Sequence, residues 1–420
     1  MANCGEFLER SAKIEQDVSL SKIERGEALI VGAGPSGMAV AACLWKLGVR
    51  STVLERESCV ASLWQQRTYD RLKLHIDKKF CELPFMSFPS QFPTFVSRSQ
   101  FVEYLEEYAK RFSIQPLFCQ TVESANFCEE TGKWRVVAYC SMERRTKIYS
   151  GRFLVVATGE NSEKFVPDLP GIERFEGIVV HSSEYKSGEE FNGKKVLVVG
   201  CGNSGMEIAL DLLDKDASPS IVVRSPLHVL PREIFGLSTF FVFTFLLKIF
   251  PLRIVDRLLL LYSRLTLGDT TACGIARPKQ GPLELKRKIG KTPVLDVGTM
   301  AKIRSGDIKT FPKIKRVMAL QVEFEDHRVE SFNAIIFATG YRSGILRWLK
   351  IEGDFFGDDG FPRKAFPNNW KEKNGLYTVG LGRRGLIGTS MDARLIAEDI
   401  KACITSSSPA NYALRSSLCI

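Results

Sequence analysis

Short apolar runs that alternate with glycines and amphipathic segments open the chain. Residues 28–31 are all apolar and predict a buried strand, and a glycine-rich stretch follows at once over 32–37. Apolar residues recur at helical spacing over 38–47, and a second strand is expected over 51–55. A strand, a glycine loop, a helix and a second strand in this order are typical of a parallel α/β unit.

The glycines of this first loop have the spacing G-x-G-x-x-G of dinucleotide-binding proteins. Gly32 permits a tight turn, Gly34 lets a pyrophosphate approach the backbone, and Gly37 lets the helix pack close to the strand. Glu55 ends the second strand, where an acid hydrogen-bonds a ribose hydroxyl in such folds. The alternative is a glycine-rich turn that serves packing alone. The predicted cofactor residues of this unit are Gly32, Ala33, Gly34, Pro35, Ser36, Gly37, Glu55 and Arg56.

The part of the chain that follows is less regular. Residues 63–75 mix large aromatic, amide and charged side chains without a clear period. They are as typical of a loop over a ligand as of an ordinary surface connection. An amphipathic helix is predicted over 99–112, with Ser99 as its cap. Strands are expected after it, three as a meander and a fourth as an apolar run into glycine, at 121–127, 133–139, 146–149 and 153–159.

The opening pattern then repeats in a second unit. A strand and a glycine loop occupy 195–205, a helix is predicted over 206–213, and the next strand over 220–224. This strand ends in Arg224, and an arginine in place of an acid suits the 2′-phosphate of NADP. The first site is therefore predicted to take a dinucleotide without that phosphate. The predicted NADP-binding residues are Gly200, Cys201, Gly202, Asn203, Ser204, Gly205 and Arg224.

The two units predict an α/β fold with two dinucleotide-binding Rossmann-like domains. A second repeat, in which 334–340 echoes 155–159, suggests that the NADP domain is inserted into the other. A chain that holds NADPH and a second dinucleotide is most simply a flavoprotein, so FAD is expected at Glu55. The predicted segments are an N-terminal extension 1–25, an FAD-binding domain 26–190 and 326–404, an NADP-binding domain 191–325, and a tail 405–420.

Composition narrows the possible classes. The 420 residues are 45% hydrophobic and 25% charged, which is typical of a globular protein with a sizeable core. The net charge of +10 is interpreted as a solvated surface with sites for anionic cofactors, and no nucleic-acid partner is expected. Eleven cysteines without a C-x-x-C pair argue against a disulfide reductase, and no metal site is expected. The polar start lacks a signal-peptide core, so a cytoplasmic location is predicted.

One apolar stretch, 237–262, leaves several interpretations open. Its uninterrupted apolar part is shorter than the roughly 20 residues that a spanning helix needs. Buried or pocket-lining helices are the preferred interpretation, because an apolar pocket would suit an aromatic substrate. A peripheral membrane contact, for instance with the surface of the endoplasmic reticulum, is the alternative.

Residues between and around the loops carry a resemblance to a known family. Phe175 to Tyr185 match the motif F-x-G-x-x-x-H-x-x-x-Y of class B flavin-dependent monooxygenases. Over about 26–403 the chain resembles the plant YUCCA flavin monooxygenases. The stretches that carry this closer likeness are 63–75, 200–208, 338–342 and 375–380.

The resemblance implies an activity: oxidative decarboxylation of indole-3-pyruvate to the auxin indole-3-acetate, with FAD, NADPH and O2, through a 4a-(hydro)peroxyflavin. It implies no catalytic side chain. His181 and Tyr185 would help to place NADP, although a structural histidine is the alternative for His181. Arg342 would meet the cofactor or the substrate carboxylate. The residues expected near the flavin are Trp64, Gln65 and His75.

Two other functions remain open from the sequence. A flavin N- or S-oxygenase of the same class would use the same loops, so the motifs do not separate it from a keto-acid monooxygenase. A non-enzymatic flavin-binding redox sensor is the alternative of another class. The oligomeric state is not predicted.

Overall fold

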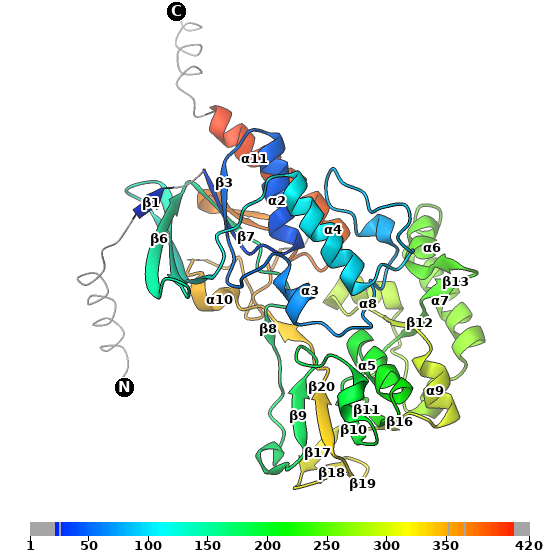
Figure 1. The fold of residues 1–420 in the computed structure, drawn as a ribbon. Coiled ribbons are helices and arrows are strands. Elements are labelled where there is room, and N and C mark those ends of the chain that lie inside the picture. The colour runs from blue at the N-terminus through cyan, green and yellow to red at the C-terminus, as the bar shows by residue number, and fades with distance from the viewer. Residues whose placement is uncertain (1–21, 25–26, 352, 365–366, 407–420) are drawn as a thin grey trace, which may run out of the picture.

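A five-stranded sheet carries the first glycine loop. The computed structural model describes residues 22–24, 27–351, 353–364 and 367–406 (Figure 1). The strand order is β22-β23-β7-β2-β3, parallel except at the β22 edge. Because the strands are parallel, their carboxyl ends and the loops that follow β2, β3 and β7 meet at one edge. The bounds are β22 Lys371–Glu372, β23 Leu376–Thr378, β7 Phe153–Val156, β2 Ala28–Val31 and β3 Ser51–Leu54.

Alternate residues of this sheet enter two different cores. Ile30 and Val155 lie with the helices, whereas Leu29 and Leu154 lie with the meander β4-β5-β6 and the short helix α10. Both faces are therefore covered, which explains why the strands are apolar at every position. The covering elements are α2 Pro35–Lys46, α4 Arg98–Arg111, α11 Gly385–Ser406, β4 Gln120–Cys128, β5 Lys133–Cys140, β6 Arg145–Gly151 and α10 Ile345–Trp348.

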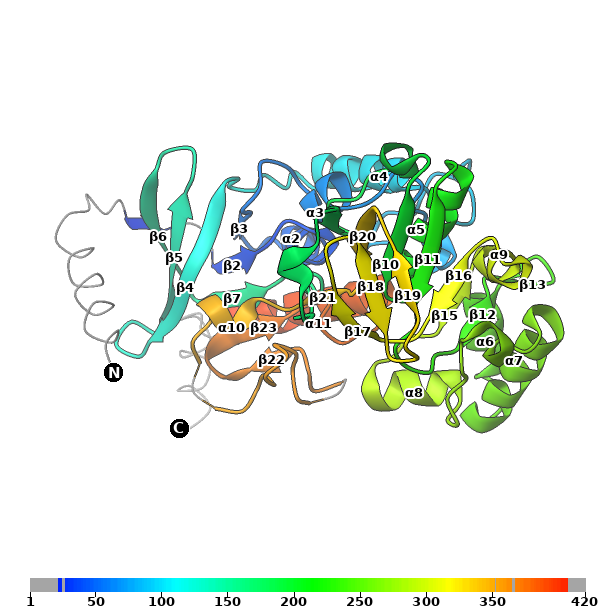
Figure 2. The same ribbon diagram turned by 90° about the horizontal axis from the view of Figure 1, so that it is seen from below.

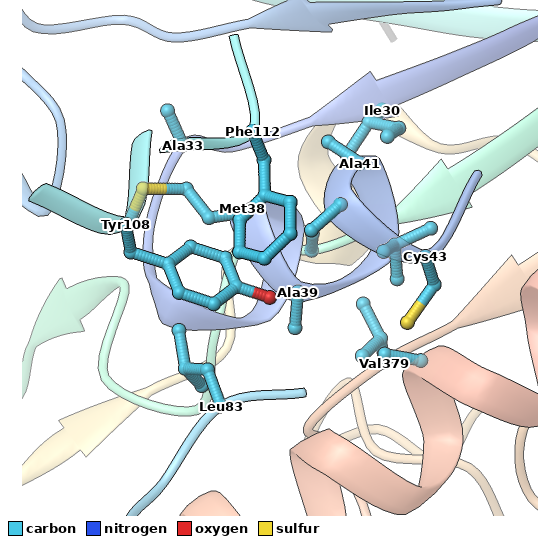
Figure 3. Close-up of a cluster of buried hydrophobic side chains, with 14 of the residues drawn as sticks. Ile30, Ala33, Met38, Ala39, Ala41, Cys43, Leu83, Tyr108, Phe112 and Val379 are labelled. Carbon is cyan, nitrogen blue, oxygen red and sulfur yellow. The ribbon is translucent and has the colours of Figure 1, made fainter. Parts of the chain in front are cut away.

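The helix after the first glycine loop is buried almost all round. Figure 3 shows Met38, Ala39 and Ala41 of α2 enclosed by side chains from distant parts of the chain, among them Tyr108 of α4 and Val379 beyond β23. α2 and α11 lie side by side, as Figure 1 shows. This packing fixes the start of α2, and with it the glycine loop, in the middle of the first unit.

A second five-stranded sheet repeats the plan. Its order is β16-β11-β10-β20-β9, and all its pairings are parallel. One face packs on α5 and α9, and the other packs on a small antiparallel sheet, β17-β18-β19. The bounds are β16 Lys309–Phe311, β11 Ser218–Val222, β10 Lys195–Val199, β20 Ala334–Phe337, β9 Ile178–His181, α5 Asn203–Asp214, α9 Thr299–Ser305, β17 Ile314–Val317, β18 Gln321–Phe324 and β19 Val329–Ser331.

Strand pairing shows which segments form the second sheet. β9 and β20 both pair within it, although they lie outside the segment 191–325 that the sequence assigned to the NADP domain. The stretch 334–340 is thus the counterpart of 153–159 in the other unit, since β20 adjoins β10 as β7 adjoins β2. The domain bounds remain a prediction, and we propose that the second domain extends from β9 to β20.

A helical part projects from the second unit. It contains the strand pairs β12–β15 and β13–β14 and the helices α6, α7 and α8. Figures 1 and 2 both place α6 and α7 at the end of the molecule opposite the meander. The bounds are β12 Val229–Pro231, β13 Glu233–Ile234, β14 Leu237–Ser238, α6 Thr239–Leu246, α7 Leu252–Leu267, α8 Pro282–Ile289 and β15 Val294–Asp296.

The preferred interpretation of 237–262 was buried or pocket-lining helices; burial is only partly confirmed, and a pocket-lining role remains a prediction. Helices do form, and Val255 and Leu259 of α7 enter a small core. Many of the other apolar side chains face solvent, Leu261 at 56% and Phe245 at 54% exposure among them. No helix among the described residues is long and apolar enough to cross a membrane.

Two local predictions need correction. Ser97, not Ser99, caps α4: its hydroxyl accepts from the Gln100 N–H, and the Gln100 side chain accepts from the Ser97 N–H. The strand β1, Lys22–Glu24, pairs in parallel with β6, although 1–25 was expected to be a loose extension. Residues 1–21 and 25–26 of that extension, and 407–420 of the predicted tail, lie outside the described residues.

Short elements complete the connections. β8 and β21 pair across the junction of the two sheets, and α3 lies in the segment after the first unit's second strand. The bounds are α3 Ser62–Gln66, η1 Lys78–Phe80, β8 Glu163–Lys164, η2 Ile172–Arg174, η3 Gly188–Phe191, η4 Thr271–Cys273, β21 Tyr341–Arg342 and η5 Lys373–Gly375.

Candidate dinucleotide-binding sites

The first glycine loop contains two glycines that the fold itself requires. Gly32 has φ +109°, and a Cβ there would lie 2.6 Å from the Ala157 carbonyl oxygen at the end of β7. A Cβ on Gly37 would lie 1.9 Å from the Gly32 carbonyl oxygen. Both positions exclude any side chain, because backbone atoms already fill the space.

Gly34 is different, because the protein leaves its surroundings free. Its φ of −76° and ψ of −177° suit any residue, and a Cβ would meet nothing within 4 Å. Since the fold does not require glycine here, close approach of a ligand explains it, as for a pyrophosphate over the start of α2. This open position fits a dinucleotide and disfavours the alternative of a turn that serves packing alone.

The second glycine loop has the same geometry. Gly200 has φ +119°, and a Cβ there would lie 2.5 Å from the Ala338 carbonyl oxygen. A Cβ on Gly205 would lie 2.0 Å from the Gly200 carbonyl oxygen. Gly202 has φ −85° and nothing within 4 Å of its added Cβ. Each sheet therefore presents one open glycine at the start of a helix, and each can take one dinucleotide.

Glu55 lies directly against the first loop. It is 5% exposed, and its carboxylate accepts from the Ala33 N–H at 2.7 Å and from the Glu57 N–H at 3.0 Å. The Ser62 hydroxyl donates to it at 3.3 Å. A carboxylate has about four acceptor positions, so one remains for a ribose hydroxyl. The carboxylate thus lies where the adenosine ribose of the first dinucleotide is expected.

Arg224 differs from Glu55 in both charge and burial. It follows β11 by two residues at the carboxyl edge of the second sheet, and its side chain is exposed. Within the part of the chain that the structure describes, its guanidinium makes no hydrogen bond or ion pair. An unpaired guanidinium at this edge can hold a phosphate through two parallel hydrogen bonds.

The segment 63–75 bridges the two units. Trp64 packs against the cores of both, and its ring meets Phe101 edge-on at 4.5 Å. The Gln65 side chain is held within the first unit, because its amide donates to the Val60 carbonyl at 2.9 Å and to Glu106 of α4 at 3.2 Å. The segment is therefore an ordered interdomain connection, and contact of Trp64 and Gln65 with the flavin remains a prediction.

A buried polar cluster joins this segment to α5, and no pattern in the sequence indicates it. The Tyr69 hydroxyl donates to Glu207 at 2.6 Å, and Glu207 is 5% exposed. His75 Nδ1 lies 3.7 Å from the same carboxylate and has no hydrogen-bond partner within the described part of the chain. Burial lowers the pKa of His75, and the Glu207 charge opposes that shift. Because Glu207 comes two residues after Gly205, this cluster fixes the second loop relative to the first unit.

A second link lies one turn further along α5. Asp211 accepts from the Tyr185 hydroxyl at 2.5 Å and from the Gly188 N–H at 2.8 Å, and Arg71 lies 3.6 Å away. Burial and the hydrogen bond to Asp211 raise the pKa of Tyr185. Tyr185 is 1% exposed, so it supports the domain junction, and a role in placing NADP would be indirect.

His181 is a fully bonded histidine. Nε2 lies 3.1 Å from the Gly340 carbonyl and must donate to it, and Nδ1 accepts from the Ser183 hydroxyl at 2.9 Å. Burial lowers the pKa of this imidazole. The arrangement favours the structural alternative, in which His181 holds the end of β9 against the turn after β20.

The other predicted residues of the two loops make contacts within the fold, and cofactor binding by them remains a prediction. Cys201 is buried against Met206, and burial raises its pKa to about 12. Asn203 accepts from the Leu295 N–H at 2.9 Å, and the Ser204 hydroxyl lies beside that of Tyr69. Pro35 begins α2, and Ser36 Oγ lies 3.4 Å from the Thr389 hydroxyl of α11.

Two predicted arginines lie on the exposed junction. Arg56 donates to the Ser162 carbonyl at 3.3 Å, and the Arg342 guanidinium covers the Phe165 ring at 4.0 Å. Both arginines lie near β8 and β21, so they are close to each other but are not buried in a pocket. Binding of cofactor or substrate by either one remains a prediction.

The structure brings two further charged side chains, Glu160 and Lys286, near each other at the carboxyl edge of the first sheet. Glu160 follows Gly159 at the end of β7, accepts from the Arg383 N–H at 2.9 Å, and has a pKa raised by burial. Lys286 of α8 has a pKa lowered by burial, which the charge of Glu160 opposes. Its ammonium lies 5.8 Å from the Phe240 ring centre. Only the fold brings α8 to this edge, and no spacing in the sequence indicates it.

Two sheets, each with an open glycine at a helix start and joined through a buried cluster, define a two-dinucleotide flavoprotein fold. The chain belongs to the flavin-binding monooxygenase-like family, whose sequence pattern it matches over residues 26–346.

Named relatives lie close in sequence. Indole-3-pyruvate monooxygenase YUCCA6 of Arabidopsis thaliana is 56% identical over 377 residues, which is 89% of this chain and 90% of the relative. The probable indole-3-pyruvate monooxygenase YUCCA4 of the same plant is 55% identical over 372 residues, 89% of each chain. Among solved structures, OTEMO in complex with FAD and NADP aligns with a TM-score of 0.69 at 17% identity, over 91% of this chain and 85% of that one.

Proposed function

We propose that this chain is an NADPH- and O2-dependent flavin monooxygenase that converts indole-3-pyruvate to indole-3-acetate. The observation that carries the cofactor part is the pair of open glycines, Gly34 and Gly202, with Glu55 at one strand end and Arg224 beyond the other. The substrate is supported by relatives more than half identical that are named for indole-3-pyruvate. A role in auxin synthesis in a plant follows from that substrate.

The residues present fit both cofactors. The first loop and Glu55 would hold FAD, because the acid suits free ribose hydroxyls. The second loop would hold NADPH, with Arg224 at the 2′-phosphate. When bound, the flavin supplies the electron transfer and oxygen activation that no side chain can provide.

The protein's own part is to bind, orient and exclude water. The bonds from Tyr69 to Glu207 and from Tyr185 to Asp211 hold α5, and so the second loop, at a fixed distance from the first. The overall reaction balances without a side-chain nucleophile. One oxygen atom of O2 enters the acid product as CO2 leaves, and the other becomes water with the two electrons of NADPH.

The substrate carboxylate is proposed to meet Lys286. Its ammonium is partly withdrawn from water beside the Phe240 ring, which would leave it ready to pair with an anion that carries an aromatic group. The variant Lys286→Met should raise the Michaelis constant for the keto acid at least tenfold and leave that for NADPH unchanged. The matched control is Lys288→Met, because Lys288 lies on the same helix but pairs with Glu284 at 2.7 Å.

One experiment separates the possible functions. The purified holoprotein is mixed with NADPH and air, with indole-3-pyruvate, an amine or a thioether, and the products are identified by mass spectrometry with 18O2. Indole-3-acetate with one labelled oxygen, formed in step with NADPH oxidation, is the expected result. Faster oxidation of the amine or thioether would make the protein an N- or S-oxygenase. Flavin reduction without turnover of any substrate would indicate a redox sensor.

We propose a cytoplasmic location for this reaction. The nine cysteines within the described residues are all free thiols, which suits a reducing compartment. Fusion to a fluorescent protein in plant cells tests this directly, and retention of the fusion in the secretory lumen would contradict it.

A further inference from the structure

The helices α6 and α7 with the β13–β14 turn before them expose an unusual amount of apolar surface. Nearly half of the large apolar side chains that are exposed in the described part of the chain lie between residues 235 and 265. We call this surface the α6–α7 face. Six of its side chains are more than half exposed, namely Phe235, Leu237, Phe245, Ile249, Leu261 and Leu265.

The outer side of α7 is a continuous apolar stripe. Ile254, Leu258, Leu261 and Leu265 are 42%, 42%, 56% and 77% exposed, and their spacing of four, three and four residues puts them on one side of the helix. A neighbouring side of the helix carries Val255 and Leu259 into the small core of the helical part. α7 is therefore apolar on two sides, and only one side has a partner within the described residues.

Basic side chains flank this stripe. At about 100° per residue, Arg253, Arg257 and Arg264 all fall on one flank of it. Lys248 lies in the exposed connection before α7. Asp256 is the one acid between residues 235 and 265, and it is 5% exposed, with its carboxylate bonded to the N–H groups of α8. The charge presented by this part of the face is therefore positive.

We infer that the α6–α7 face lies on an anionic lipid bilayer, in the interface and without crossing it. An apolar stripe with arginines beside it is the pattern of an interfacial helix, whose apolar side enters the boundary between headgroups and acyl chains. The anionic headgroups complement the exposed lysine and arginines. This binding surface is separate from the flavin chemistry and does not rest on the proposed function.

A second copy of the chain fits this face less well than a bilayer does. A two-fold dimer would bring the same patch of both copies together, and so would place like charges opposite one another. The inner side of α6 is already anchored, since Phe240 meets Phe80 of the first unit with ring centres 4.8 Å apart. Figures 1 and 2 show α6 and α7 at one end of the molecule, where a flat surface can reach them.

The test is flotation of the holoprotein with lipid vesicles. One set of vesicles is phosphatidylcholine alone and the other contains about one-third phosphatidylserine, each at low and high salt. We expect the protein to float with the anionic vesicles, and salt to weaken the binding. Changing the stripe to glutamine (Ile254→Gln, Leu258→Gln, Leu261→Gln, Leu265→Gln) should reduce the partition constant at least 100-fold. Removing the three arginine charges (Arg253→Gln, Arg257→Gln, Arg264→Gln) should reduce it at least tenfold.

Controls keep the test independent of folding and activity. A matched quadruple variant changes exposed apolar residues elsewhere (Met142→Gln, Val166→Gln, Leu320→Gln, Val329→Gln) and should bind vesicles like the parent. All variants should keep the parent's melting temperature, flavin content and NADPH oxidation. Equal flotation of the stripe variant and the parent would overturn the inference. So would a parent that does not float, or a dimer in solution that the stripe variant converts to monomers.

Discussion

The two glycine loops of this protein share one backbone arrangement and differ in what lies beside them. In both, the first glycine has φ above +100° and lies against a carbonyl at the end of the neighbouring strand. A Cβ added to the third glycine would lie within 2.0 Å of the carbonyl oxygen of the first. Beside the first loop lies a buried, bonded acid, Glu55. Beside the second lies an exposed base, Arg224, which has no hydrogen bond or ion pair among the described residues. The comparison distinguishes the glycines that the backbone arrangement requires from the neighbouring charged residues that are expected to select the ligand.

The two units also differ in how they are held. The glycine helix of the first unit is enclosed by apolar side chains, as Figure 3 shows, whereas α5 of the second unit carries Glu207 and Asp211 into buried contacts with tyrosines. Burial also lowers the pKa of two histidines of the second unit, His181 and His228. The second unit should therefore respond more strongly to polar substitutions and to acid.

The largest effect is expected at the third glycine of each loop. Gly37→Val and Gly205→Val would drive side-chain atoms into a carbonyl oxygen that lies 1.9 or 2.0 Å from the new Cβ. Each should lose on the order of 3 kcal/mol or more of unfolding free energy, because neither backbone can move away. Chemical denaturation and the yield of folded protein measure this. A native stability in either variant would show that the loops relax more freely than their close packing indicates.

The second glycines should separate the two cofactors. The Cβ that Gly34→Val or Gly202→Val adds has no protein atom within 4 Å, so both variants should fold with the parent's melting temperature. Gly34→Val should lose the yellow flavin, and Gly202→Val should retain it but fail to oxidise NADPH. Absorbance spectra and stopped-flow reduction distinguish these outcomes. If both variants lost the same cofactor, or kept both, the assignment of one dinucleotide to each loop would be wrong.

A smaller effect is expected at the strand end of the second unit. Arg224→Ala should raise the Michaelis constant for NADPH roughly 10- to 150-fold, since hydrogen bonds to charged groups contribute about 1.5–3 kcal/mol. NADH lacks the 2′-phosphate and should be nearly unaffected. Arg224→Glu should increase the loss for NADPH, because a carboxylate repels the phosphate. Arg174→Ala, at an exposed arginine of η2, is the matched control, and equal losses for both coenzymes would point to a structural role of Arg224.

The smallest effect is a loss of stability in mild acid, mainly in the second unit. Burial lowers the pKa of His75, His181 and His228, so the unfolded chain takes up these protons first as the pH falls below about 6.5. Their contribution to stability is complete above that pH and is lost below it, by at most about 1.4 kcal/mol per pH unit for each histidine. Unfolding at several pH values measures the slope. His181→Gln should reduce the slope, whereas His327→Gln, at an exposed position, should not.

The order in which acid releases the cofactors refines this prediction. His181 and His228 belong to the second unit, and His75 lies at its border beside Glu207. NADPH affinity should therefore fall at a higher pH than flavin retention does. Release of the flavin before any change in NADPH binding would contradict the contrast between the two units.

The sequence by itself determined the parts of this protein that depend on neighbouring residues. Residues 28–31 and 195–199 are strands because they are apolar at every position, and the glycine spacing fixes the turn that follows each. Residues 99–111 are helical because their apolar positions recur with a helical period. Both dinucleotide units and their order could therefore be predicted, since strand, turn and helix preferences act over a few residues.

Only the tertiary structure decided which distant groups meet. Tyr69 and Glu207 lie 138 positions apart, and His181 and Gly340 lie 159 apart, so no local pattern could pair them. The strand 334–337 pairs with β10 and β9 of the second sheet. Its apolar sequence is compatible with either sheet, so it could not indicate these partners. Helices over 237–262 were expected to be buried or to line a pocket, but the stripe on α7 is exposed. Whether an apolar side chain is covered depends on what the rest of the chain brings to it, and here the chain brings nothing among the residues described.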